Sequence, residues 1–332
     1  MIIENVEKEN ASFITLTNSA GLKLTLCDYG AGIYSIFYDG KSMNVAPTDK
    51  KSWLNEDTYF GKTVGRIAGR LSKGRLNYLG NEYQLSVNEG ENTLHGGKEG
   101  FSFRHFKMDV VHLGDSVAVD YYLVSPAGDM GFPGEIALRV RYIVKEDEPS
   151  FKIVYLAKSK SETPLNLTCH AYFNLGGEDD VEKQLLFVNS DETMSYDKEL
   201  IPLGFKKSPS CLDFSTPKEI GKDIDDPYLT SIRTLGYDHC FLFKEANAEE
   251  TQIRMESQDY VMDIKTSLPA AQIYSYNYPH IGEELVSGKK TKLHSGLAIE
   301  PVYKPGDFHS MSVISDTPKS DFIEYIFKKK GE

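Results

Sequence analysis

The sequence of 332 residues contains 49 acidic and 37 basic side chains, and its formal net charge of −12 argues against a surface that binds nucleic acid. No block of lysine and arginine offers an anchor to a membrane surface, and no apolar stretch is long enough to span a bilayer. The N-terminus also lacks a basic segment followed by an apolar run, so we expect a cytoplasmic protein whose partners are small neutral molecules.

Short apolar segments with a period of two indicate β-strands throughout the chain. Residues 12–38 are predicted to form a hairpin pair, and residues 76–85 a hairpin that turns at Gly80 and Asn81. Further strands are predicted at 117–124, 136–144, 151–157, 185–188, 239–243, 253–255, 260–264, 272–276, 297–299 and 322–327. No helical stripe persists and no strand-helix-strand order appears. We therefore predict an all-β protein of large packed sheets that forms one domain over residues 1–332.

The segment 164–177 alternates between two kinds of side chain. One face carries residues that suit a core: Leu165, Leu167, Cys169, Ala171, Phe173 and Leu175. The other face carries short hydrogen-bonding groups and no lysine or glutamate: Asn166, Thr168, His170, Tyr172 and Asn174. Such a face suits the wall of a cleft for a polyhydroxylated ligand. The alternative is a polar sheet face under a loop, in which His170 only satisfies hydrogen bonds.

Two glycine-rich loops carry further candidate residues. The segment 65–75 has four cations and no acid, and its glycines let the backbone approach a ligand, so Arg70 is a candidate clamp for a ligand oxygen. The loop 88–97 contains His95, and loops on a rigid scaffold commonly carry function. The alternatives are a solvated basic loop for Arg70 and an ordinary turn residue for His95.

Two carboxylates lie at the ends of predicted strands. Asp238 precedes the strand 239–243 and is a candidate acceptor for sugar hydroxyls, although an aspartate that caps a turn is as common. Glu300 is followed by Pro301, which we expect to end the strand, and a strand holds a general base more rigidly than a loop does. The alternative is an ordinary edge glutamate. Nucleotide-binding, serine-hydrolase and zinc-protease motifs are missing, and the four scattered cysteines indicate reduced thiols in the core.

Taken jointly, these segments resemble the aldose 1-epimerase (galactose mutarotase) family. They occur in the order of the family from about residue 15 to 325, and they include Gly65-Arg-Ile-Ala-Gly-Arg70, Asn92-Thr-Leu-His-Gly-Gly97, 128–134, 166–175, 236–239, 272–274 and Leu297-Ala-Ile-Glu-Pro301. The resemblance implies a large antiparallel β-sandwich, the galactose mutarotase-like supersandwich, with an open carbohydrate-binding cleft. It implies no metal and no redox cofactor. It also implies an isomerase that interconverts the α and β anomers of free hexoses such as galactose and glucose.

The resemblance gives each candidate residue a role. It implies that Glu300 is the catalytic base and His170 the catalytic acid. It implies that four residues bind the sugar: Arg70, His95, Asp238 and Gln272. Anomer exchange needs such a pair, because one group removes the proton of the anomeric hydroxyl while the other protonates the ring oxygen. We expect Glu300 to be anionic and a nearby carboxylate to raise the pKa of His170, so that the imidazole stays charged.

The sequence departs from the common pattern of the family beside these residues. Gly69 stands where asparagine is frequent, and Val302 replaces a glutamine. Cys169 and Ala171 flank His170 where asparagine and serine are usual. The candidate catalytic groups are intact, so the changes bear mainly on which sugar is preferred.

Three other functions compete with this prediction. A hexose-6-phosphate 1-epimerase is suggested by the cations of segment 65–75. A non-catalytic sugar-binding protein would keep the cleft alone, and the presence of both Glu300 and His170 argues against it. A glycosidase needs two carboxylates beside the scissile bond, which Asp238 and Glu300 could supply, but the strand of His170 would then have no role. No pattern in the sequence indicates an oligomeric state.

Overall fold

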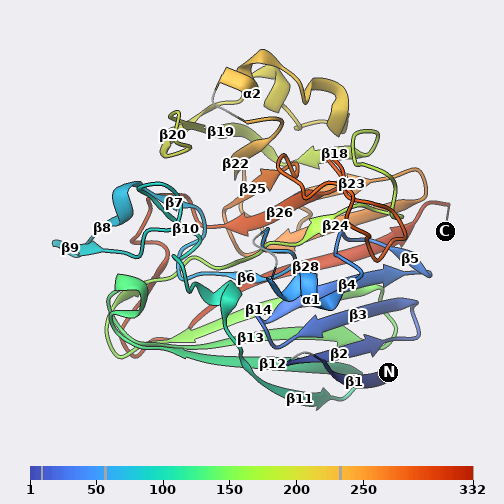
Figure 1. Cartoon of the computed structure of the whole chain (residues 1–332), viewed down its shortest axis with the longest axis horizontal. Coiled ribbons are helices and arrows are strands. Elements are labelled where there is room, and N and C mark those ends of the chain that lie inside the picture. Colours follow the sequence, from blue (N-terminus) through green and yellow to red (C-terminus); the bar gives the residue numbers. More distant parts are fainter. Residues whose placement is uncertain (9, 56–57, 232–233, 332) are drawn as a thin grey trace.

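A computed structural model describes residues 1–8, 10–55, 58–231 and 234–331. Among these residues, β-strands dominate and every pair of neighbouring strands is antiparallel (Figure 1). Sheets of five, nine and six strands form the body of the molecule, and smaller two-stranded sheets lie beside them. The predicted all-β class with large antiparallel sheets is confirmed.

The first sheet is an N-terminal meander in which each strand pairs with the next. Its strands are β1 (Ile2–Lys8), β2 (Ala11–Thr17), β3 (Leu22–Cys27), β4 (Gly32–Tyr38) and β5 (Lys41–Ser42). The hairpin predicted within residues 12–38 is β2 and β3, and β4 extends it.

The largest sheet has nine strands and extends in Figure 1 from β11 at the bottom to β18 in the upper half. In spatial order its strands are β11 (Lys107–Leu113), β12 (Ser116–Ser125), β13 (Ile136–Lys145), β14 (Ser150–Lys158), β28 (Lys319–Lys329), β24 (Tyr260–Thr266), β23 (Ile253–Glu256), β18 (Leu185–Val188) and β21 (Lys218–Glu219). The C-terminal strand β28 pairs with β14 on one side and β24 on the other. It thereby joins segments from both halves of the chain in one sheet.

The six-stranded sheet carries most of the candidate site. Its spatial order is β17 (Tyr172–Phe173), β26 (Leu297–Val302), β25 (Ala270–Tyr274), β22 (Asp238–Phe243), β19 (Ser190–Tyr196) and β20 (Pro202–Lys207). The prediction that Pro301 ends its strand is wrong, because β26 continues to Val302. β17 pairs only with Leu297 and Ala298, so β26 has an open edge at Pro301, where a missing N–H is tolerated.

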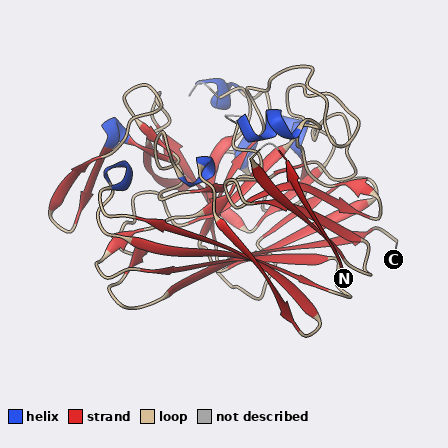
Figure 2. Cartoon of the chain, turned by 60° about the horizontal axis from the view of Figure 1, so that its bottom comes forward, coloured by secondary structure: helices blue, strands red, loops and turns tan. Residues whose placement is uncertain are grey.

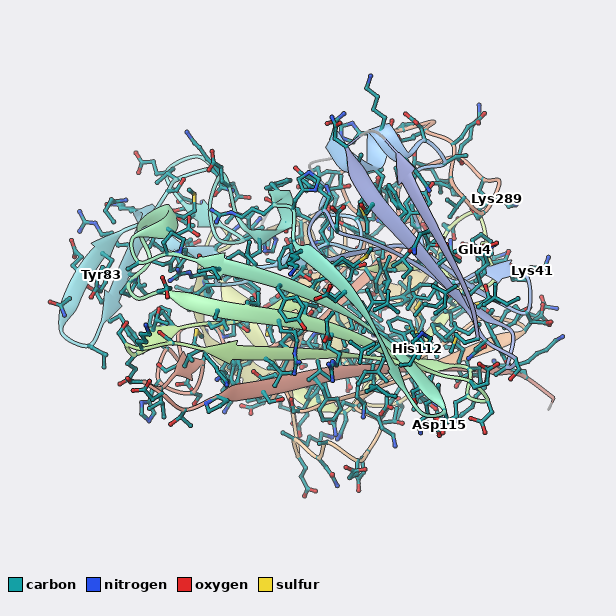
Figure 3. The ribbon with its side chains drawn as sticks, turned by 90° about the horizontal axis from the view of Figure 1, so that it is seen from below. Glu4, Lys41, Tyr83, His112, Asp115 and Lys289 are labelled. Carbon is teal, nitrogen blue, oxygen red and sulfur yellow. The ribbon has the colours of Figure 1, made fainter. Side chains whose placement is uncertain are left out.

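Short elements connect the sheets. The two-stranded pairs are β7 (Arg70–Leu71) with β10 (Thr93–Leu94), β6 (Thr63–Val64) with β16 (Thr168–Cys169), β15 (Thr163–Pro164) with β27 (Ser312–Val313), and β8 (Arg75–Tyr78) with β9 (Asn81–Gln84). The helices are α1 (Lys50–Asn55), α2 (Pro227–Ser231) and the 3-10 turns η1 (Ser72–Gly74), η2 (Phe101–Phe103), η3 (Asp129–Gly131), η4 (Ser210–Leu212) and η5 (Ile220–Asp223). None of the described helices is long and apolar enough to cross a membrane. In the view of Figure 3, Tyr83 of the β8–β9 hairpin lies at the opposite end from Glu4 and Lys41.

The large sheets pack around one main core (Figure 2). All three contribute fully buried side chains to it, among them Leu24 of β3, Val140 of β13 and Ile299 of β26. A strand with one face in the core and the other face outward has alternating apolar and polar residues, and this alternation is the pattern from which the strands were predicted.

The segment 164–177 is not the single strand that its alternation suggests. It begins with the last residue of β15 and then forms β16 and β17, and these two-residue strands pair with β27, β6 and β26 in three different sheets. The alternation itself survives, because the apolar face from Leu165 to Leu175 lies in the main core. Asn166, His170 and Tyr172 line a cavity on the other side. An extended segment can pair with a different strand every few residues and still send alternate side chains to opposite sides. A period of two in the sequence therefore cannot show where one short strand ends and the next begins.

Candidate active site

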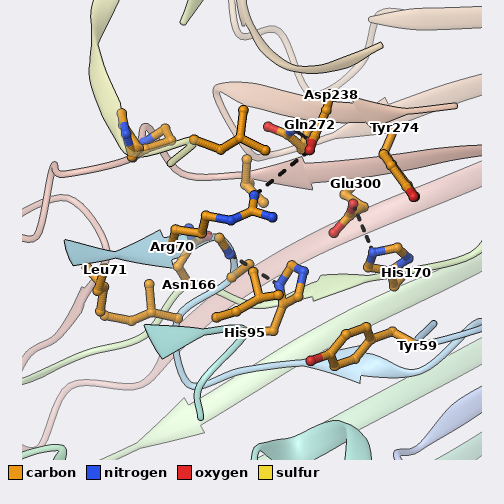
Figure 4. A pocket seen from close by; sticks show the side chains of 18 of the residues that line it. Tyr59, Arg70, Leu71, His95, Asn166, His170, Asp238, Gln272, Tyr274 and Glu300 are labelled. Atoms are coloured by element: carbon orange, nitrogen blue, oxygen red, sulfur yellow. Dashed lines mark hydrogen bonds and ion pairs between the residues drawn. The ribbon is translucent and has the colours of Figure 1, made fainter. Parts of the chain in front are cut away.

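A cavity of about 430 Å³ lies between the six-stranded sheet and the β7–β10 pair (Figure 4). Its volume is within the range of roughly 300–1,000 Å³ that is common for small-molecule sites. The structure brings all six candidate residues into its lining: Arg70, His95, His170, Asp238, Gln272 and Glu300. They come from six separate segments of the chain.

Glu300 and His170 meet at one end of the cavity. Glu300 lies within β26, opposite Gln272 of β25. The backbone of His170 is fixed, because its N–H donates to the carbonyl of Lys62 and its own carbonyl accepts from the N–H of Gly61. Nε2 of His170 lies 3.4 Å from Oε1 of Glu300. The residues are 4% and 2% exposed, so the pair is nearly withdrawn from solvent.

Burial controls the protonation of this pair. It lowers the pKa of His170 to about 4. It also raises the pKa of Glu300 well above its usual range, with a smaller contribution from the charge of Asp238. The expectation that a nearby carboxylate keeps His170 charged is therefore wrong here, since burial disfavours both charges. The favoured form has the proton on the Glu300 carboxyl and a neutral imidazole.

Arg70 provides a positive charge in the half of the cavity that lies away from Glu300 and His170. Its Nε and Nη2 donate to the two carboxylate oxygens of Glu89 over 2.6 and 2.8 Å. Its Nη1 lies 3.9 Å from Oδ2 of Asp238, while Gln272 donates to Oδ1 of Asp238 over 2.6 Å. Burial opposes the charge of Arg70, but Glu89 and Asp238 outweigh it and the pKa of Arg70 is raised. Burial raises the pKa of Asp238, although Arg70 acts against this shift.

His95 presents a hydrogen-bond donor to the cavity. Its Nδ1 accepts from the N–H of Gly69 over 3.3 Å, so the neutral ring carries its proton on Nε2. Burial lowers the pKa of His95 well below its usual value, and the neighbouring charge of Arg70 acts in the same direction. His95 is therefore neutral near pH 7.

Several aromatic residues of the cavity were not predicted. The ring of Tyr59 stacks on His170 at 5.7 Å between centroids and lies 4.8 Å from His95. Tyr274 lies 6.5 Å from His170, and it could have been found because it follows Gln272 by two residues on the same face of β25. Tyr59 lies in a turn with φ +62 and has no periodic signal around it.

The arrangement places a buried carboxyl and imidazole beside several hydrogen-bonding side chains in a cavity lined in part by aromatic rings. That combination suits proton transfer on a polyhydroxylated ring. Within the described part of the chain, no three side chains of His, Cys, Asp or Glu lie close enough to hold a metal ion.

Comparisons with known proteins agree with this chemistry. The sequence profile of the family described as Aldose 1-epimerase matches residues 12–312. The chain belongs to the aldose 1-epimerase family. Galactose mutarotase of Rattus norvegicus is 32% identical over 256 residues, which cover 75% of this chain and 72% of the relative. Aldose 1-epimerase of Escherichia coli K12 is 32% identical over 309 residues, which cover 88% and 86%.

Solved structures agree as well. The crystal structure of galactose 1-epimerase from Lactobacillus acidophilus NCFM superimposes with a TM-score of 0.88 at 26% identity, and the match covers 99% of this chain and 98% of that one. The fold is therefore the galactose mutarotase-like fold. The activity of the chain is that of an aldose 1-epimerase, which is an isomerase activity.

The departures from the common aldose 1-epimerase pattern fall into two groups. Cys169 and Ala171 are fully buried in the main core and do not line the cavity. Gly69 and Val302 do line it. Gly69 has φ +87, a conformation that glycine adopts freely and asparagine tolerates better than most residues, so this exchange is structurally mild. Val302 gives the aldose 1-epimerase cavity an apolar wall.

Proposed function

We propose that the protein interconverts the α and β anomers of free hexoses such as galactose and glucose, with Glu300 as the base and His170 as the acid. One observation carries the proposal: Nε2 of His170 and Oε1 of Glu300 lie 3.4 Å apart in a cavity that also contains hydroxyl-binding groups. A pyranose beside this pair can present its anomeric hydroxyl to one group and its ring oxygen to the other.

Ring opening moves two protons. The pair shares one proton, and it reacts in the form in which this proton has passed from Glu300 to His170. Glu300 then takes the proton of the C1 hydroxyl, the C1–O5 bond breaks, and O5 keeps the electron pair and takes the proton of His170. The sugar becomes an open-chain aldehyde, and the pair is left as a protonated carboxyl and a neutral imidazole. Burial favours this form of the pair. Rotation about C1–C2 exposes the other face of the aldehyde, and attack by O5 returns both protons.

Four residues are proposed to hold the sugar: Arg70, His95, Asp238 and Gln272. The 3.9 Å between Nη1 of Arg70 and Oδ2 of Asp238 is too long for a direct hydrogen bond. A hydroxyl oxygen on the cavity side of both atoms can accept from the guanidinium and donate to the carboxylate. His95 adds a donor through Nε2. The sugar is thereby oriented for both proton transfers.

A free sugar fits the charges of the cavity better than a sugar phosphate does. Of the four cations in segment 65–75, Arg66 is 2% exposed and donates to backbone carbonyls, for example those of Pro133 and Gly134 over 2.8 Å. Arg70 is paired with Glu89, and Lys73 and Arg75 do not line the cavity. A phosphate dianion would therefore meet carboxylates instead of a free cation.

We also infer that residues 1–332 act as one domain in the cytoplasm. The pairing of β28 with both β14 and β24 supports the single domain. All four cysteines are buried free thiols, which is typical of proteins from a reducing compartment.

The protein is expected to accelerate anomer exchange of galactose and glucose and to leave glucose 6-phosphate at its rate in buffer. NMR saturation transfer between the two anomeric protons of each sugar measures this. Acceleration confined to glucose 6-phosphate would show that the enzyme acts on phosphosugars. Binding of the free sugars without any acceleration would show a sugar-binding protein.

The value of kcat/KM is expected to stay level through neutral pH and to fall as the pH drops through about 4, where His170 takes up a proton. A pair that holds two protons cannot accept the proton of the anomeric hydroxyl. An independent histidine acid with its ordinary pKa of about 6.5 would instead make the rate fall as the pH rises through that value. A pH–rate profile from about 3.5 to 8.5 separates the two outcomes.

A further inference from the structure

Glu89 controls the orientation of Arg70 from outside the cavity lining. The two parallel hydrogen bonds from Nε and Nη2, at 2.6 and 2.8 Å, fix the plane of the guanidinium. The third nitrogen, Nη1, is then left to face Asp238 across 3.9 Å. The direction in which Arg70 offers a donor to a sugar is therefore set by Glu89.

The backbone of Glu89 is held in a tight turn. Its N–H donates to the carbonyl of Asn92 over 3.1 Å, and the N–H of Asn92 donates back over 2.8 Å, with Gly90 at φ +57 between them. The side chain of Asn92 is buried, accepts from the N–H of Lys73 over 2.9 Å and donates to Glu199 over 3.2 Å. The turn is thus tied to two neighbouring segments, and Glu89 has a rigid base.

Glu89 also changes the charge that a ligand meets. Two carboxylates, Glu89 and Asp238, face the single cation Arg70, whose side chain is only 19% exposed. The net charge of Glu89, Asp238 and Arg70 together is therefore negative. The charge of Glu89 also contributes to the raised pKa of Asp238. A negatively charged substituent of a sugar would be repelled here more than a hydroxyl.

We propose that Glu89 is a positioning residue that aims Arg70 at a sugar hydroxyl and makes the cavity select neutral over anionic aldoses. This inference rests on the proposed function and adds a specificity determinant to it. Without the Glu89 carboxylate, the guanidinium can turn toward Asp238 and form a direct ion pair, which removes the two groups that a hydroxyl would otherwise bridge. Loss of Glu89 therefore weakens sugar binding and removes a negative charge at the same time.

Two substitutions separate these effects. Glu89→Gln keeps the shape and one acceptor but removes the charge, so kcat/KM for galactose is expected to fall about tenfold, mainly through KM. The ratio of kcat/KM for galacturonic acid to that for galactose is expected to rise about tenfold, the size that one unit charge gives in a partly buried site. Glu89→Asp keeps the charge and loses the reach, so KM for galactose rises while the ratio stays unchanged.

Glu91→Gln is the matched control, because Glu91 is an exposed glutamate in the same turn. Its kcat/KM for galactose and its kcat/KM for galacturonic acid are expected to equal those of the wild type. Thermal unfolding checks that every variant is folded. An unchanged ratio in folded Glu89→Gln would overturn the proposal and leave Glu89 with a structural role only. A wild type that accelerates neither sugar would contradict the proposed function itself, which is a different result.

Discussion

Glu300→Gln is expected to lower kcat for galactose anomer exchange by about 10³-fold, within the range of 10²–10⁴ that a well-placed general base contributes. The amide has nearly the shape of the carboxyl but cannot take the proton of the anomeric hydroxyl. Arg70 and Asp238 remain to bind the sugar, so KM should change little. NMR saturation transfer at several galactose concentrations gives both constants.

The same substitution should leave the fold intact. Burial raises the pKa of Glu300, so the folded protein retains this proton at a pH where the unfolded chain releases it. By linkage, the wild type loses stability relative to Glu300→Gln as the pH rises above the ordinary carboxyl pKa of 4.5. Thermal unfolding of both proteins between about pH 5 and 8 measures this trend.

Glu324→Gln provides the control for Glu300→Gln. Glu324 also lies in a central strand, β28, but it faces Lys152 at 3.4 Å outside the cavity. Its substitution should keep the wild-type rate. If Glu300→Gln turned over galactose as fast as the wild type, Glu300 would not be the base.

The strands were predictable because one face of each is buried in a common core. β13 and β14 show the alternation over seven or more residues, and the predicted bounds of β12, β13 and β14 lie close to those observed. β11 was missed, because it is an edge strand whose side chains are mostly exposed or half-buried and carry little alternation. The breaks within 164–177 depend on β6, β26 and β27, which lie elsewhere in the chain.

The site was predictable to the extent that its residues lie in family motifs. Arg70 and Glu300 were found through their neighbours in sequence, and the structure places them in one cavity. Glu89 stands in the predicted loop 88–97, but nothing local shows that it pairs with Arg70. The protonation of His170 was wrongly predicted, since the pKa depends on burial, and burial is a property of the folded protein.

His170→Asn is expected to lower kcat by about 10²–10³-fold, because the amide cannot protonate O5 when the C1–O5 bond breaks. His294→Asn is its control. His294 is also 2% exposed, but it bonds to Glu182 and the carbonyl of Leu235 outside the cavity lining, so its loss should reduce the midpoint of thermal unfolding and leave kcat unchanged.

The variant that combines Glu300→Gln with His170→Asn decides whether the two groups act together. Ring opening needs one proton removed and one supplied in the same event, so a single substitution already disables the pair. The double variant should therefore be only slightly slower than the slower single variant. A loss in kcat equal to the product of the two single losses would mean that Glu300 and His170 act independently. The 3.4 Å between Nε2 and Oε1, and the pKa shifts that burial imposes on both, favour the first outcome.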